Sequence, residues 1–334
     1  MNIKDNLLSL SNAVGLGNIY HAANIAFDII SKYTTATKNG LNIIGRLEGM
    51  GDYTLLLEAH IDEVGFIVTD IDSDGFLTVK NCGGIDLRAL PARVVTIHGK
   101  REVTGVFCAT PPHLAKGEQK YDDISTLKID SLLGDTARDI ISVGDFVSFK
   151  QEAVPMLNNQ VTGKSLDNRA GVACLLETAK RLSGKELPFN VVFALTNEEE
   201  LGHRGAKTAA FSACTDEALV LDVSFADGPD IAAKDCGRLS GGGMIGISPV
   251  LDKELSNKLA DIAKENNIPY QLEVMGGATG TNSDVISISK SGVKTGLISI
   301  PLRNMHTDVE TVCIDDLISV CDLLEQYVLG GALL

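Results

Sequence analysis

The chain has 334 residues, of which 44% are hydrophobic and 22% are charged, enough for one large core with a second small domain or for two domains of middling size. Its 29 Lys and Arg against 44 Asp and Glu leave a net charge of −15, which argues against a nucleic-acid backbone or an anionic membrane surface as a partner. The first residues lack the apolar region of a signal peptide, and no apolar stretch approaches the roughly 20 residues of a membrane helix, so we expect a cytoplasmic protein.

In the N-terminal part, apolar periodicity predicts a helix over about 18–33 and a short strand over about 42–46. The segment YTLLLEAHIDEVGFIV, residues 53–68, then contains two strand-like apolar runs separated by polar residues. From about residue 70 to 160, short β-rich pieces alternate with Gly, Pro and Asp turns, and helical patterns are scarce. This texture predicts a small all-β module.

After about residue 163, helical and strand patterns alternate again. Helices are predicted over 168–183, 252–267 and 315–329, and strands over 189–196, 217–224 and 294–300. Alternation of this kind is typical of a largely parallel central sheet with helices on both faces. We therefore predict an α/β domain made of 1–69 and 160–334, interrupted by an inserted β-rich domain at 70–159. The Gly-rich segment 240–246 is interpreted as a turn and not as a phosphate loop.

Ionisable residues gather where the predicted strands end. In open α/β sheets, ligands collect at the carboxyl ends of the strands. Two histidines and several acids fall at or near such ends, and one further acid stands where a helix begins: His60, Asp62, Glu198, Glu199, Glu200, Asp222 and His306, with Asp167 at the helix.

Each of these residues also has an ordinary explanation. His60 or His306 could be a surface histidine in a loop, Asp167 a helix N-cap, and the glutamates a solvated helix start. Together, however, they supply the nitrogen and oxygen ligands of zinc or a similar divalent ion, and their number suits two ions sharing a carboxylate. The histidines at 21, 98, 113 and 203 show no comparable setting.

Five sequence blocks resemble, in order and spacing, the M42 family of metallo-aminopeptidases. These are the tetrahedral aminopeptidases, whose members often carry the labels cellulase M or endoglucanase. The blocks are LLLEAHIDEVGF (55–66), GKSLDNRAGV (163–172), TNEEELGHRGA (196–206), LVLDVSFADGP (219–229) and SIPLRNMHTDVE (299–310). The resemblance covers about 50–325 and implies a zinc-peptidase type of fold. The β-rich insertion is similar to that family's dimerisation domain.

The resemblance also implies the chemistry of the site. It implies two divalent metal ions per subunit, with zinc expected and cobalt or manganese as alternatives. Asp167 would bridge the ions, and the other ligands would be His60 and Asp222 for one ion and Glu200 and His306 for the other. Asp62 would orient His60, and Glu199 would be the general base that activates water held by the metal. The implied function is removal of N-terminal residues from short peptides by a homo-oligomer, in which dimers build a dodecamer.

Two departures from the family pattern fall near these residues. Glu198 occupies a position that is usually Gln and adds a negative charge beside Glu199, and Asn282 occupies a position that is commonly Asp. Two other functions stay open. A glycoside hydrolase needs only paired acids, which leaves the histidines unexplained, and the chain has no Trp for sugar stacking. A catalytically inactive assembly subunit would bind metal without hydrolysing any peptide.

Overall fold

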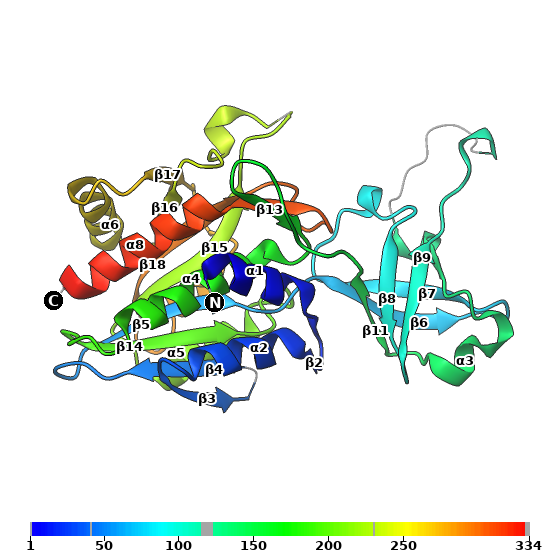
Figure 1. Cartoon of the computed structure of the whole chain (residues 1–334), viewed down its shortest axis with the longest axis horizontal. Helices are drawn as coiled ribbons and strands as arrows, with labels where there is room; N and C mark the ends of the chain where they lie inside the picture. The colour runs from blue at the N-terminus through cyan, green and yellow to red at the C-terminus, as the bar shows by residue number, and fades with distance from the viewer. Residues whose placement is uncertain (1, 41, 115–122, 230, 331–334) are drawn as a thin grey trace.

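The computed structural model describes residues 2–40, 42–114, 123–229 and 231–330. A large part built around an eight-stranded sheet lies beside a smaller closed β-barrel (Figure 1). The chain is thus a mixed α/β protein. The stretch 115–122 of the predicted β-rich domain lies outside the described residues.

The large sheet has the strand order β17-β16-β18-β15-β5-β14-β4-β3. Its four central strands are parallel, whereas β16 and β4 pair antiparallel with β18 and β14. The prediction of a largely parallel sheet is therefore correct for the centre and for the edge pair β16–β17, and the sheet as a whole is mixed. The strands are β3 Thr35–Asn39, β4 Asn42–Leu47, β5 Thr54–His60, β14 Asn190–Thr196, β15 Glu217–Phe225, β16 Gly243–Ile247, β17 Tyr270–Val274 and β18 Lys294–Leu302.

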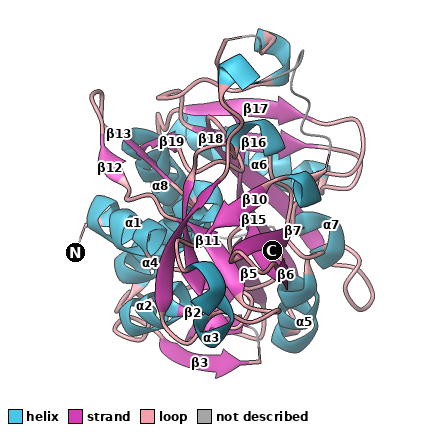
Figure 2. Cartoon of the chain, turned by 90° about the vertical axis from the view of Figure 1, so that its right-hand side faces the viewer, coloured by secondary structure: helices cyan, strands magenta, loops and turns pink. Residues whose placement is uncertain are grey.

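Helices cover both faces of this sheet (Figure 2). Alternate residues of β5 enter different cores: Leu55 and Leu57 pack among one set of helices, and Leu56 packs among the other. The first set is α1 Ile3–Asn12, α2 His21–Ile30, α4 Leu166–Leu182, α6 Lys253–Glu265 and α8 Ile314–Gly330, and the second is α5 Arg204–Ala213 with the short α7 Ser283–Ile286. Burial on both sides explains why β5 contains three consecutive leucines and why β14 contains a run of five apolar residues.

The barrel has the strand order β10-β7-β6-β11-β8-β9 and a core of its own. Phe66 packs edge-on against Phe107 and Phe149 at ring-centroid distances of 5.0 and 5.6 Å. The strands are β6 Gly65–Ile71, β7 Phe76–Cys82, β8 Val94–His98, β9 Glu102–Phe107, β10 Lys128–Asp130 and β11 Phe146–Phe149, and α3 Ala137–Ile140 lies between the last two. The division into a catalytic and a dimerisation domain stays a prediction.

The chain returns from the barrel through β12 Val154–Pro155 and β13 Gln160–Gly163, which form a small sheet with β19 Glu310–Cys313. Near the N-terminus, the helix predicted at 18–33 is shorter and follows the hairpin of β1 Gly15–Leu16 and β2 Ile19–Tyr20. The segment 240–246 was interpreted as a turn, but only residues 240–242 lie outside a strand, and residues 243–246 belong to β16. Within the described ranges, no helix combines the length and the apolar character that crossing a membrane requires.

Candidate active site

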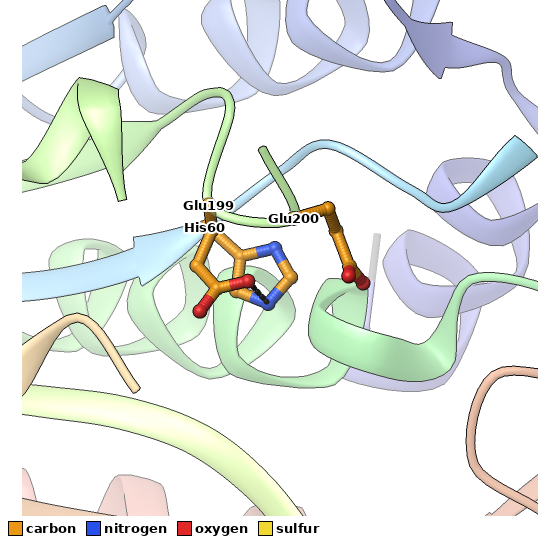
Figure 3. Close-up of side chains that lie close together, drawn as sticks. All are labelled: His60, Glu199 and Glu200. Atoms are coloured by element: carbon orange, nitrogen blue, oxygen red, sulfur yellow. Dashed lines mark ion pairs between the residues drawn. The ribbon is translucent and has the colours of Figure 1, made fainter. Parts of the chain in front are cut away.

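The carboxyl ends of the central strands meet at one edge of the sheet. Thr196 of β14 lies opposite His60 of β5, and β15 pairs with the other side of β5. Figure 3 shows His60 at the end of its strand and Glu199 and Glu200 on the turn that follows β14. A cavity of about 500 Å³ opens here. Of the seven residues to which the family resemblance assigns a role, all except Asp62 line it: His60, Asp167, Glu199, Glu200, Asp222 and His306.

Asp167 lies between the two histidines. Its Oδ1 is 3.1 Å from Nε2 of His60, and its Oδ2 is 3.3 Å from Nε2 of His306. The backbone leaves helical geometry at Asp167 and Asn168, and the Asn168 side chain holds this turn by donating to the Leu221 carbonyl at 2.7 Å. Oδ1 of Asn168 accepts from the backbone N–H of Gly171 at 3.0 Å where the regular helix begins, so Asn168 caps the helix and Asp167 does not.

Three groups of side chains could each hold a metal ion, because their ligand atoms lie within 4.8 Å of one another. Two of these groups share Asp167: one adds His60 and Asp222, and the other adds Glu200 and His306. The third combines His60, Glu199 and Glu200. The donors are nitrogen and oxygen atoms only, and several acids face one buried space, so the residues fit divalent cations well.

The crowding of acids shifts the proton affinities of the whole group. Burial raises the pKa of Asp222 to about 6, and burial together with Asp167 raises the pKa of Glu200. Burial opposes a charge on His60. The surrounding carboxylates, of which Glu199 has the largest effect, nevertheless hold the pKa of His60 well above its ordinary value. Asp167 is also buried, yet the two histidines lower its pKa. The acids and the histidines of this cluster therefore perturb one another's pKa values.

Two buried acids hold the backbone of the site residues. Asp62 accepts hydrogen bonds from the backbone N–H groups of Glu199 and Glu200, at 3.1 and 3.2 Å, and its Oδ1 lies 3.4 Å from Nδ1 of His60. Glu310 accepts from the N–H groups of Asp167 and His306, at 3.1 and 2.8 Å. Sequence reasoning did not single out Glu310, and its only signal was its position shortly after His306.

His203 was not predicted to be a site residue, and this prediction is wrong. It lines the cavity, and its Nδ1 lies 2.9 Å from Oε1 of Glu199. The same nitrogen is 3.1 Å from Oδ1 of Asn282, a side chain that is 1% exposed. The hydrogen bond to Glu199 raises the pKa of His203.

The extra carboxylate of Glu198 has a partner of its own. Its Oε2 lies 2.9 Å from a guanidinium nitrogen of Arg204, so the added negative charge is offset by a neighbouring cation. Glu198 is thereby tied to the start of α5, while Glu199 and Glu200 enter the cavity.

The barrel also reaches the site. A Cβ at Gly83 would lie 3.1 Å from Oε2 of Glu200, and a Cβ at Gly84 would lie 3.3 Å from Nδ1 of His306. Arg93 at the barrel forms an ion pair of 3.3 Å with buried Asp308, beside His306. A loop of the predicted insertion, directly after β7, therefore lies close to two of the site residues.

Known peptidases share the fold and part of the sequence of this chain. Residues 41–323 match the family described as M42 glutamyl aminopeptidase. A putative aminopeptidase of Acetivibrio thermocellus is 33% identical over 298 residues, 86% of each chain, and the lysyl aminopeptidase of Pyrococcus furiosus is 30% identical over 280 residues, 80% of this chain and 79% of its own. An aminopeptidase structure from Desulfurococcus kamchatkensis superposes with a TM-score of 0.92 at 28% identity, covering 98% of this chain and 95% of its own.

These relationships define a hydrolase of peptide bonds with a mixed α/β fold. The chain belongs to the M42 aminopeptidase family, as its five sequence blocks predicted. The structure brings all seven predicted site residues together, and their individual roles stay predictions.

Proposed function

We propose that this chain is a co-catalytic metal aminopeptidase that removes N-terminal residues from short peptides. The observation that carries the proposal is the position of Asp167, whose two carboxylate oxygens face two different histidines at 3.1 and 3.3 Å. A carboxylate shared in this way suits a site for two neighbouring cations. The aminopeptidase names of the relatives support the reaction.

The ligand sets follow from the shared carboxylate. His60 and Asp222 would complete one ion site with Asp167, and Glu200 and His306 would complete the other. Zinc is the ion that we expect, with cobalt or manganese as alternatives, because imidazole and carboxylate donors accept all three. When bound, two such cations would polarise the scissile carbonyl and lower the pKa of water in the site.

The proton steps fall to Glu199. Its Oε2 lies 4.0 Å from Nε2 of His60 and faces the ligand cluster, while its backbone is held by Asp62. From this position the carboxylate would take a proton from the attacking water and deliver it to the leaving amine. Asp62, which lies 3.4 Å from the other ring nitrogen of His60, would keep that ring oriented.

The assembly is part of the proposal. A solved Pyrococcus horikoshii TET1 peptidase can form a tetrahedron or a large octahedral shell, and it superposes on this chain with a TM-score of 0.87 at 30% identity over 99% of this chain and 100% of its own. We infer that this chain also forms a homo-oligomer, with dimers joined through the barrel and a dodecamer as the final state. Light scattering after size-exclusion chromatography should then give a mass twelve times that of the chain.

Metal removal and reloading test the enzymatic part. Protein stripped with a chelator and reloaded with Zn or Co is assayed on aminoacyl chromogenic substrates with acidic, basic and apolar residues, and in parallel on a soluble β-glucan. Aminoacyl hydrolysis that disappears with the metal and returns with it is the expected result. Hydrolysis of the glucan that is indifferent to chelator would instead identify a glycosidase, and metal uptake without any turnover would identify an inactive subunit.

A further inference from the structure

The ring of His203 lies 2.9 Å from the proposed general base, Glu199. Among the described residues, His203 belongs to none of the three groups that could hold a metal ion. His203 stands at the N-cap of α5 in the left-handed region, with φ of 60°, and its side chain is 26% exposed. Its Nδ1 lies between two oxygens, Oε1 of Glu199 at 2.9 Å and Oδ1 of Asn282 at 3.1 Å. A carboxylate oxygen and an amide oxygen both accept hydrogen bonds, so Nδ1 carries the proton that is shared between them.

Two buried acceptors fix the orientation of the Asn282 amide group. Its Nδ2 donates to Oε1 of buried Glu58 at 2.8 Å and to Oγ1 of Thr196 at 3.2 Å. A flipped amide would place its oxygen against these atoms and its NH₂ group against the Nδ1–H of His203. The buried network therefore keeps an acceptor in front of His203 and sets the tautomer of the imidazole.

The consequence for Glu199 is that its two carboxylate oxygens have different partners. Oε1 lies 2.9 Å from Nδ1 of His203, whereas Oε2 faces the ligand cluster 4.0 Å from Nε2 of His60. The backbone N–H of the same residue is bound to Asp62 at 3.1 Å. Glu199 is thus held through its backbone and through Oε1, and Oε2 stays available for proton transfer.

We propose that His203, held in place by Asn282, is a positioning residue that fixes the carboxylate of Glu199 and leaves Oε2 as the oxygen that exchanges the proton. This inference rests on the proposed function, because it assigns a support to the base named there. Misplacing a reacting group by about 1 Å can cost on the order of 100-fold in rate. A lost support should therefore lower kcat while the binding of substrate stays intact.

Two substitutions at position 203 separate the hydrogen bond from the backbone conformation. Glycine and asparagine both tolerate a positive φ, so neither strains the turn. His203→Gly removes the donor, and kcat should fall by about 10- to 100-fold with KM within about twofold of wild type. His203→Asn places an amide N–H near the position of Nδ1 and should restore most of kcat. If the glycine variant does not fold, His203→Asp replaces it, since Asp has the shape of Asn without the donor.

Matched controls keep the outcomes distinct. Cys214→Gly changes the exposed left-handed residue at the other end of α5, with φ of 52°, and should leave kcat unchanged. Glu199→Gln tests the base itself: activity retained in this variant would remove the proposed function. Glu199→Gln without activity together with a fully active His203→Gly would overturn the positioning role alone. A rise in KM at constant kcat would overturn it too, because His203 would then be a substrate contact.

A crystal structure of each metal-free variant provides a readout that does not depend on turnover. In His203→Gly the Glu199 carboxylate should leave its wild-type position or occupy several positions, and in His203→Asn it should return. A Glu199 side chain in the same position in both variants would contradict the proposal.

Discussion

The ammonium group of Lys164 lies 2.5 Å from Oε2 of Glu63, and both side chains are almost completely buried. Glu63 follows β5 on the way out to the barrel, and Lys164 follows β13 on the way back. The two crossings of the chain are therefore joined by an ion pair. Arg169 adds a second cation 3.7 Å from Oε1 of Glu63, and the backbone N–H of Gly15 donates to the same oxygen at 2.8 Å.

Lys164→Met is expected to destabilise the fold strongly. Burial opposes the charge of Glu63, but Lys164 lowers its pKa overall, so removal of the ammonium leaves a buried carboxylate short of a counter-charge. Breaking a buried pair from one side costs about 3–5 kcal/mol. Chemical denaturation of the metal-free protein measures this loss. Lys180→Met is the matched control, because its pair with Glu177 is at the surface and is worth about 0–1 kcal/mol. Equal losses in both variants would show that burial does not determine the strength of the pair.

Asp167→Asn and Asp222→Asn should differ in the number of ions lost. If Asp167 is shared by two ions, its amide variant loses affinity for both, whereas Asp222→Asn weakens one site only. Metal analysis after dialysis should then give close to no bound ion in the first variant and about one in the second. Identical metal contents in the two variants would contradict a bridging role for Asp167.

Glu199→Gln should abolish turnover without removing metal. A positioned general base contributes about 10²- to 10⁴-fold to a rate, and Gln keeps the shape of the side chain but cannot accept the proton. Activity on the best aminoacyl substrate and metal content are measured on the same sample. Glu198→Gln serves as the control, because Glu198 is paired with Arg204, and it should keep most of its activity.

Glu58→Gln should reveal a pH-dependent cost of a buried acid. Burial raises the pKa of Glu58 from 4.5 to about 8, so between these values the folded protein binds a proton that the unfolded chain has lost. The free energy of unfolding of the wild type must then fall, relative to the Gln variant, by up to about 1.4 kcal/mol per pH unit as the pH rises through this window. Below pH 4.5 the difference should be constant. Unfolding of the metal-free proteins at several pH values measures it, and parallel curves would show that Glu58 is charged in the fold.

The central part of the fold was predictable because burial on both faces leaves a clear pattern. The strands β5, β14, β15 and β18 are rich in apolar residues, and the acids and histidines at or near their ends identified the site. Two of the elements that were missed have weaker patterns. α5 is rich in Ala and follows a left-handed residue, so large apolar residues do not mark its buried face. β17 is an edge strand whose Leu272 and Val274 are exposed, so its apolar residues do not mark a buried face either.

The supporting residues of the site were not predictable for a different reason. Glu310 acts through hydrogen bonds to backbone groups, and Asn282 meets Glu58 across 224 residues of chain. His203 is close to Glu199 in sequence, but its contact depends on the turn that directs both side chains to one cavity. Such roles depend on tertiary geometry, which spacing in one sequence does not contain.

The glycines at positions 83 and 84 limit how far the enzyme can be trimmed. Because the barrel places this side-chain-free loop against Glu200 and His306, a shortened chain that joins residue 64 directly to residue 150 would remove the backbone beside these two side chains. A minimal version of this peptidase would therefore need a substitute for the loop before it could keep Glu200 and His306 in the same surroundings.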